Sequence, residues 1–385
     1  MSAEPAANAS GGKKPEKPPM MARFGKRYFA SRSSKVKAVN SGDALHVLNE
    51  QERKALRRVE IGAVARAALA GALSGGVCAA AEVFANDEWP EDVVKYWLFL
   101  GGITVVASIA EIAFIYWDTL RSVHELARVA GIELFGKDRE SSDDALVDAL
   151  ARAALELPNP VDMGMGVNPH REVKKWRLVL ASLAYKAKVG VTNFLIKMMI
   201  RRVGGRVVLR QALPFVALPV TAFWNGVVTW LVLREARIRA MGPSAIEALV
   251  KVIFDDAPLL SPEGKLSAMR AVAAAIVRTQ DLHPNLVRLL SVASKRAGDT
   301  GKAELDDVGL FLNDLPKLDP RERKVSLQLV AVACVVDGRV SSRERKLWSD
   351  ALAAAGKSME PQLLDKLRLG FVRGDEGTAA TLRDV

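Results

Sequence analysis

Cysteine is scarce in this sequence, and its scarcity limits the chemistry that the chain can carry. Only Cys78 and Cys334 occur among the 385 residues, and no Cys-x-x-Cys pair exists. Two cysteines cannot form a disulfide framework or a cysteine zinc cluster, so a reducing compartment fits most of the chain. The four histidines are scattered, and none joins nearby acids or cysteines in a metal-ligand pattern.

Signatures of the common enzyme classes are lacking too. The sequence contains no phosphate-binding glycine-lysine loop, no dinucleotide-binding glycine fingerprint and no nucleophile elbow. Signals for β-strands are few, whereas helical periodicity is widespread. We therefore expect an all-α protein that is not an enzyme and has no certain cofactor.

Positive charge is concentrated at one end of the chain. The net charge is +11, and residues 1–66 hold 14 Lys and Arg against 6 Asp and Glu. A basic surface spread over a fold is typical of nucleic-acid binding, so we expect no nucleic-acid partner here. Residues 1–40 are expected to form a disordered basic tail, and residues 41–66 a juxtamembrane helix.

Within that tail, residues 21–39 interleave aromatic side chains with cations. Cations attract anionic lipid headgroups and aromatic rings enter the membrane interface, so this stretch is a candidate membrane-surface strip. A solvated charged linker is the alternative. The strip residues are Arg23, Phe24, Lys26, Arg27, Tyr28, Phe29 and Arg32.

Two long hydrophobic runs follow the basic region. Residues 67–85 and 97–117 each approach the ~20 residues that cross a hydrocarbon core. The link between them is acidic, and the flank before the first run is basic. By the positive-inside rule, we expect a transmembrane hairpin at 67–117 in the inner (plasma) membrane, with both termini cytoplasmic. A buried hairpin in a soluble protein is the alternative.

Small residues recur along the first run. Gly71, Gly75 and Ala79 are spaced by four, which places them on one helix face where a partner helix can approach closely. The sequence therefore predicts helix packing along this face.

Each hydrophobic run also contains one acid. Glu82 extends the face of small residues, and Glu111 lies in the second run. An acid inside a membrane segment is a candidate functional residue, but both acids are close enough to an interface to pair or to reach water. Arg66, at the inner edge of the first run, could reach toward Glu111.

Residues 118–244 are expected to form a membrane-apposed helical domain. Its apolar stretches at 178–200 and 211–233 flank a cluster of four arginines. If these stretches formed a spanning hairpin, the arginines would lie outside, against the charge rule. We therefore expect a re-entrant or surface-buried helical pair, with a third span at 211–233 as the alternative.

The last part of the chain is charged and has the pattern of soluble helices. Ser261 followed by Pro262 gives a helix cap with proline at the first helical position. Residues 325–336 are apolar almost all round, which predicts a central buried helix. We expect a helical bundle over 245–371 and a flexible tail over 372–385.

One corner of this bundle is a candidate ligand site. An apolar run ends at Asp337, and a second helical run begins near Glu344. Ser341 and Glu344 have the spacing of a capping box. Asp337 would lie at a helix C-terminus, where a negative charge needs Arg339, Arg343 or a cation as a partner. A simple helix corner and a metal site at Asp337 and Glu344 are both open.

The stretch LQLVAVACVVDGRVSSRERKLWSDALAAAG resembles the TerB-like tellurite-resistance family. Its pattern is an apolar helix, an Asp-Gly break, a glutamate and an amphipathic helix that ends near glycine. The resemblance implies an all-helical domain in membrane-stress or surveillance complexes, with Asp337 and Glu344 as candidate ligands of a divalent cation such as Ca or Mg. The corresponding break at 278–283 lacks Asp-Gly, a departure from a symmetric acidic site.

The stretches SVHELARVAGIELFG, KVGVTNFLIK and LPFVALPVTAFWNGVV look somewhat like the EcsC family of membrane-associated bacterial proteins. That resemblance covers 118–250 and implies no settled chemistry.

From these observations we expect a non-enzymatic inner-membrane protein. Its partners would be the lipid bilayer, anionic lipids and a protein bound by a cytoplasmic TerB-like module in an envelope or stress response. The alternative is a transport-related protein in which 178–233 enters the bilayer and Glu82, Glu111 or Lys197 lines a pathway.

Overall fold

The computed structural model is helical throughout its described residues, with no β-strand among them, so the all-α prediction is confirmed there. The structure describes residues 20–33, 47–132, 141–157, 159, 166–171, 208–255, 259–298, 303–358 and 362–385. The predicted disordered tail at 1–40 is wrong for residues 20–33, which form a helix with Ala22 and Phe29 buried. The rest of that tail and the run at 178–207, with Lys197, lie outside these ranges.

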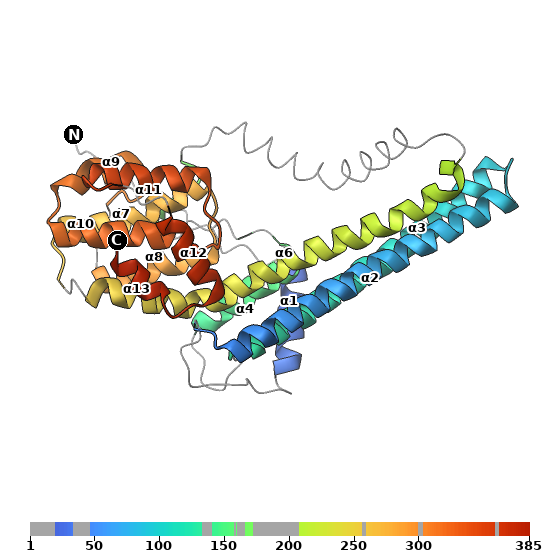
Figure 1. Cartoon of the computed structure of the whole chain (residues 1–385), viewed down its shortest axis with the longest axis horizontal. Coiled ribbons are helices and arrows are strands. Elements are labelled where there is room, and N and C mark those ends of the chain that lie inside the picture. The colour runs from blue at the N-terminus through green and yellow to red at the C-terminus, as the bar shows by residue number, and fades with distance from the viewer. Residues whose placement is uncertain are drawn as a thin grey trace, which may run out of the picture.

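Three long helices form a stem that projects from the rest of the molecule (Figure 1). They are α2 (Glu50–Glu88), α3 (Val93–Val129) and the first half of α6 (Val208–Asp255). A tight turn at the tip of the stem joins α2 to α3. By length and composition, α2 and α3 could each cross a membrane.

Shorter helices pack around the base of the stem. They are α1 (Met20–Ser33) and α4 (Ser141–Ala154), which lie against α3 and α6. Phe29, Leu120, Leu150 and Leu233 come from these four helices and are fully buried in one core. The base is thus a small folded unit, and the stem extends beyond it.

The last third of the chain forms a bundle. Its helices are α7 (Pro262–Thr279), α8 (Pro284–Ala297), α9 (Val308–Asp314), the short η2 (Leu315–Lys317), α10 (Pro320–Ala333), α11 (Ser342–Ala354), α12 (Leu363–Arg373) and α13 (Thr378–Arg383). Ser261 caps α7 by accepting from the Gly264 N–H, as its position before a proline predicts. Every residue from Val325 to Val336 is buried, so the predicted central helix is confirmed.

Helix α6 belongs to both the stem and the bundle. Leu233 and Met241 are in the core at the base, whereas Ile246 and Ile253 are in the core of the bundle. The predicted domain boundary between 244 and 245 is wrong, because it falls inside this continuous helix. The apolar face of α6 changes partners along its length without any break in the helix.

Only residues 211–233 of the expected re-entrant or surface-buried helical pair are described, so the pair stays a prediction. Residues 211–233 lie within α6, which continues through Pro214 and Pro219. A proline inside a helix removes one backbone hydrogen bond. In the stem, α6 lies against α2.

The C-terminal tail is folded, so the prediction of a flexible segment at 372–385 is wrong. Gly374 ends α12 in the left-handed conformation, and the chain then turns into α13. Leu382 and Val385 are buried, and Gln328 Nε2 donates to Leu382 O at 3.0 Å. Burial of these two side chains outweighs the polar residues of the preceding turn.

Candidate functional site

The corner between α10 and α11 is held by a capping box. Ser341 Oγ accepts from the Glu344 N–H at 3.2 Å, and Glu344 Oε2 accepts from the Ser341 N–H at 2.6 Å. The capping-box prediction is therefore confirmed. The two residues satisfy backbone donors that the start of a helix would otherwise leave unpaired.

The carboxylate of Glu344 also has a partner outside its own helix. Thr279 Oγ1, at the end of α7, donates to Glu344 Oε1 at 2.9 Å. Glu344 is 1% exposed, and burial followed by the nearby charge of Asp337 raises its pKa above the ordinary value. The Glu344 side chain thus joins α11 to α7, but burial makes its ionised form less favourable.

Asp337 lies beside this cap and is only partly covered. Its Oδ1 accepts from the Arg339 N–H at 2.8 Å. Burial raises the pKa of Asp337, while that hydrogen bond and the charge of Arg339 oppose the rise. Of the partners expected from the sequence, Arg339 therefore contributes through its backbone as well as its charge.

The donor set at this corner does not fit a divalent cation. Both oxygens of Glu344 already accept hydrogen bonds, and Oδ1 of Asp337 accepts another. Calcium requires six to eight oxygen ligands. Within the described ranges, no group of three or more His, Cys, Asp or Glu side chains is placed to hold an ion.

A second polar group lies behind the corner, between α6 and the start of α8. His283 Nδ1 caps α8 by accepting from the Asn285 N–H, so Nε2 carries the proton and donates to Glu235 Oε1 at 2.9 Å. Arg239 Nε donates to the same oxygen at 2.8 Å, and its Nη1 donates to Ala149 O in α4. The carboxylate therefore bonds the start of α8 to α6, and Arg239 links the same group to α4.

The surroundings of Glu235 favour its ionised form. Burial opposes ionisation, but the hydrogen bonds from His283 and Arg239 and the charge of Arg239 outweigh it and lower the pKa to about 2. A buried carboxylate with two such donors stabilises a fixed arrangement of its neighbours. We name Glu235, Arg239 and His283 the junction cluster.

The backbone of the corner also contacts α6. Gly338 has φ +74°, and a β-carbon there would lie 2.3 Å from Ile238 Cδ1. Arg234 Nη2 donates to Gly338 O at 2.9 Å, and Asn285 Nδ2 donates to Val336 O at 2.8 Å. The Asp-Gly break is therefore required for close packing on the long helix.

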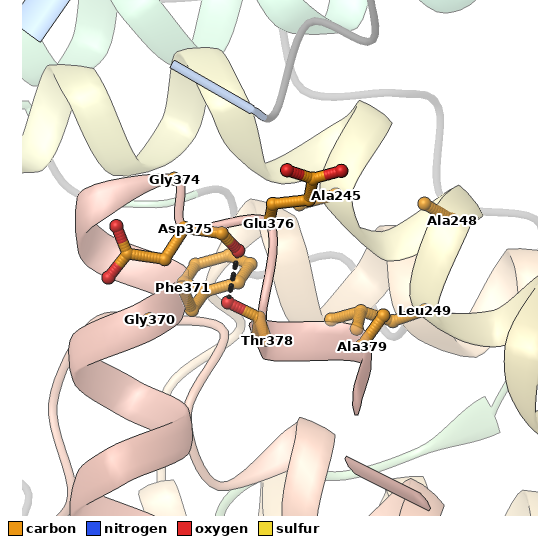
Figure 2. Close-up of a pocket in the computed structure, with 10 residues that line it drawn as sticks. All are labelled: Ala245, Ala248, Leu249, Gly370, Phe371, Gly374, Asp375, Glu376, Thr378 and Ala379. Carbon is orange, nitrogen blue, oxygen red and sulfur yellow. Dashed lines mark hydrogen bonds between the residues drawn. The ribbon is translucent and has the colours of Figure 1, made fainter. Parts of the chain in front are cut away.

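A small cavity lies between α6 and the turn that leads into α13 (Figure 2). Ala245 and Leu249 of α6 face Phe371 and Thr378 across it. Thr378 Oγ1 donates to Asp375 O at 2.7 Å. The cavity has a volume of about 30 Å³, which is enough for a water molecule but not for a small-molecule ligand.

In the stem, the small residues of α2 lie against α6. Gly71 and Ala79 are buried and Gly75 is half-buried. A β-carbon on Gly71 would lie 2.8 Å from Thr221 O, and one on Gly75 would lie 3.4 Å from Leu218 Cα. The close partner of this face is therefore α6, a helix that the sequence did not single out for this contact.

The two acids of the stem have different surroundings. Glu111 accepts a hydrogen bond from Asn225 Nδ2, which joins α3 to α6, while Glu82 is half-buried on α2. The expected approach of Arg66 to Glu111 is wrong. Arg66 Nε instead donates to Asp118 Oδ1 at 2.8 Å, because Asp118 is the acid level with it at the base.

The candidate membrane-surface strip lies on α1 at the base of the stem (Figure 1). Arg23, Phe24 and Arg27 are exposed, whereas Tyr28 is half-buried. Phe29 is fully buried and stacks on His124 with ring centroids 6.2 Å apart. The prediction that Phe29 enters a membrane interface is therefore wrong, since α1 uses that face to pack on α3.

The other strip residues are two cations. Lys26 pairs with Asp148 of α4 at 3.8 Å. Arg32 is exposed and lies over the Tyr28 ring at 5.8 Å from its centroid. The arginines on the outward face of α1 are thus exposed and can meet anionic groups. Lys26 instead forms an ion pair within the base.

Sequence reasoning missed the junction cluster. The Glu235–Arg239 spacing of four is a visible helical ion-pair signal, and His283 stands directly before a helix-starting proline. Nothing local in the sequence indicates that these two signals meet, because they are 48 residues apart.

Comparisons with protein-family models, with curated proteins and with solved structures find no match to this chain, so the TerB-like and EcsC-like resemblances rest on the quoted residues alone.

Proposed function

We propose that the chain is a membrane protein whose stem anchors it in a lipid bilayer and holds the C-terminal bundle at the membrane surface. The observation that carries this proposal is the outward surface of α2 and α3. Leu98 is 72% exposed and Val106 66% exposed, and Leu73 and Ile109 are similarly uncovered. A monomer in water rarely exposes a contiguous apolar surface of this length.

The charges at the two ends of the stem support one orientation. The tip carries Asp87, Glu88 and Glu91, whereas the base carries Arg57, Arg66 and Arg121 among others. Cytoplasmic flanks of membrane helices are enriched in arginine and lysine. The proposed topology places the base, α1 and the bundle in the cytoplasm of a cell whose inner membrane holds the stem.

We propose a protein-binding role for the bundle rather than catalysis. The polar groups brought together at the corner and at the junction cluster are used in helix caps and interhelical bonds. The TerB-like resemblance favours a module of membrane-stress or surveillance complexes. In this role the continuous α6 would fix the position of the bundle relative to the membrane.

The experiment tests whether the stem is inserted in the membrane and on which side of the membrane its tip lies. In the full chain with Cys78→Ala and Cys334→Ala, a single Glu91→Cys at the tip should react from outside with a membrane-impermeant thiol reagent. The protein should also remain in the membrane after an alkaline wash. Release by the wash, or labelling of Glu91→Cys only after permeabilisation, would rule out this anchor.

A transport-related role is the second candidate, and one observation favours it. The bond between Asn225 and Glu111 places an acid and an amide inside the stem. If Glu111 lined a pathway, Glu111→Gln would abolish the movement of a proton or cation into vesicles that hold the protein. If it is a packing residue, vesicles that hold the unmodified protein should already leak no more ions than protein-free vesicles, and Glu111→Gln should change nothing.

A further inference from the structure

Helix α6 runs antiparallel to α2 at very short separation. A β-carbon on Gly71 would lie 2.6 Å from Asn225 Nδ2 and 2.8 Å from Thr221 O. One on Gly75 would lie 3.0 Å from Thr221 Oγ1. At the other end of the contact, a β-carbon on Gly226 would lie 3.4 Å from Val64 Cγ1. Such contacts are typical of helices that pack through small residues.

This register covers the whole first hydrophobic run. Gly226 is level with the residues just before Ala67, and Leu218 is level with Gly75. Continued to the end of α6, the same antiparallel register places Val208 level with about Ala85. The first half of α6 therefore passes the full length of the run 67–85 and does not stop part of the way along it.

The length and composition of α6 match the hydrocarbon core of a bilayer. No residue from Gln211 to Leu233 is charged, and arginines stand directly before and after this run. At 1.5 Å per residue the run is about 34 Å long, enough for a hydrocarbon core of ~30 Å. This uncharged run is therefore long enough to cross a bilayer by itself.

The side chains of α6 are sorted by direction. Phe223 is 67% exposed and Trp230 47% exposed, so large apolar side chains point away from the other two helices. The polar ones point inward. Thr221 Oγ1 donates to Gly71 O at 2.9 Å, and Asn225 donates to Glu111. This arrangement places apolar atoms toward lipid and satisfies polar atoms within the stem.

We propose that α6 is a third membrane-spanning helix, parallel to α3, whose outward face is covered by lipid acyl chains. The occupant is lipid because this face continues the exposed apolar surface of α2 and α3. The inference rests on the proposed membrane anchor and adds the topology of its third helix. In this topology, Val208 at the start of α6 lies at the outer surface of the membrane. Helix α4, which precedes α6, lies at the inner surface.

The test uses single cysteines in the full chain with Cys78→Ala and Cys334→Ala. Val208→Cys, Leu209→Cys and Arg210→Cys are made separately, because successive helix positions differ by about 100° and three of them therefore sample different sides of the helix. Glu91→Cys reports the tip of the hairpin, and the exposed Glu247→Cys reports the bundle. Intact cells receive a membrane-impermeant thiol reagent before or after permeabilisation.

The proposal predicts that at least one of the three α6 positions labels from outside as completely as Glu91→Cys, while Glu247→Cys labels only after permeabilisation. If Glu91→Cys labels from outside but all three α6 positions stay silent until permeabilisation, the hairpin stands and the third span is wrong. Silence of all three after permeabilisation would also overturn it. If Glu91→Cys itself requires permeabilisation, the membrane anchor has failed as well.

Discussion

His283 Nε2 lies 2.9 Å from Glu235 Oε1, so the bundle is bonded to the helix that also builds the stem. Arg239 donates to the same carboxylate and reaches α4 at the base. Removing the charge of Glu235 should therefore loosen both contacts together. Because the pKa of Glu235 falls from 4.5 to about 2 on folding, its ionised form contributes about 3 kcal/mol at neutral pH.

We predict that Glu235→Gln lowers the Tm of the full chain in detergent by about 5–10 °C at pH 7. The carboxylate stabilises the folded state above the unfolded pKa, and this contribution is lost as pH falls from 4.5 toward 2. The gap between the two proteins should therefore close across that interval. Intrinsic tryptophan fluorescence measured during heating reports the Tm.

A second ion pair between α6 and α8 provides a matched control. Glu247 pairs with Arg288, but the Glu247 side chain is 54% exposed. Exposed pairs contribute roughly 0–1 kcal/mol, so Glu247→Gln should leave the Tm almost unchanged. Equal losses for Glu235→Gln and Glu247→Gln would show that burial of the junction cluster does not matter.

Local signals in the sequence predicted the described elements well. Ser261 and Ser341 each precede a helix at a capping position, and their side chains accept the expected backbone N–H groups. The apolar run 325–336 is buried because it is apolar on every side. These features depend on neighbours within four residues, which the sequence shows directly.

Features that depend on distant partners were not predictable in the same way. Gly242-Pro243-Ser244 is a helix-breaking signal in the sequence, yet α6 continues through it, because the helix packs on the base before this point and on the bundle after it. Arg66 bonds Asp118 and not Glu111 because the turn that joins α2 and α3 sets which residues are level. Periodicity shows which face of a helix is apolar, but it does not show what covers that face.

The contact between α2 and α6 gives a second prediction. Gly71→Leu should destabilise the stem, because even a β-carbon would lie 2.8 Å from the backbone oxygen of Thr221. Gly101 of α3 is the control, since a β-carbon there meets no atom within 4 Å. Replacing a helical glycine gains up to about 1 kcal/mol of helix propensity at either position.

We therefore expect a large fall in Tm for Gly71→Leu and an unchanged or slightly raised Tm for Gly101→Leu. Both proteins are compared with the unmodified chain in the same detergent. A Gly71→Leu protein as stable as the Gly101→Leu protein would mean that α6 does not lie against this face of α2.

The exposed arginines of α1 give a third prediction. Each cation near an anionic surface contributes about 1 kcal/mol to binding, so neutralising Arg23, Arg27 and Arg32 should weaken binding by about two orders of magnitude. The change is measured with a peptide of residues 20–39 and vesicles that contain phosphatidylserine. High salt should weaken the unmodified peptide in the same way. Equal affinity for neutral and anionic vesicles would contradict an electrostatic role for this strip.

The last prediction separates a helix corner from a metal site at Asp337 and Glu344. Burial raises the pKa of both carboxyl groups, so the folded state holds their protons more tightly than the unfolded state. Their protonated forms favour folding below the unfolded pKa, and this advantage is lost as pH rises through the folded pKa. At neutral pH the buried charge of Glu344 therefore costs stability, unless a cation balances it.

Glu344→Gln removes that charge and keeps an oxygen that can accept from the Ser341 N–H, whereas Glu344→Ala removes the cap altogether. We expect Glu344→Gln to match or exceed the Tm of the unmodified chain at pH 7. Glu344→Ala should lose about 1–3 kcal/mol, because the Ser341 N–H would then be left without an acceptor, while Thr279 Oγ1 keeps Ala275 O. The Tm of the unmodified chain should be the same with chelator and with millimolar calcium or magnesium. A cation-dependent rise in Tm that Asp337→Ala or Glu344→Gln abolishes would instead establish the metal site, because the carboxylates would then be ligands and not only parts of a corner.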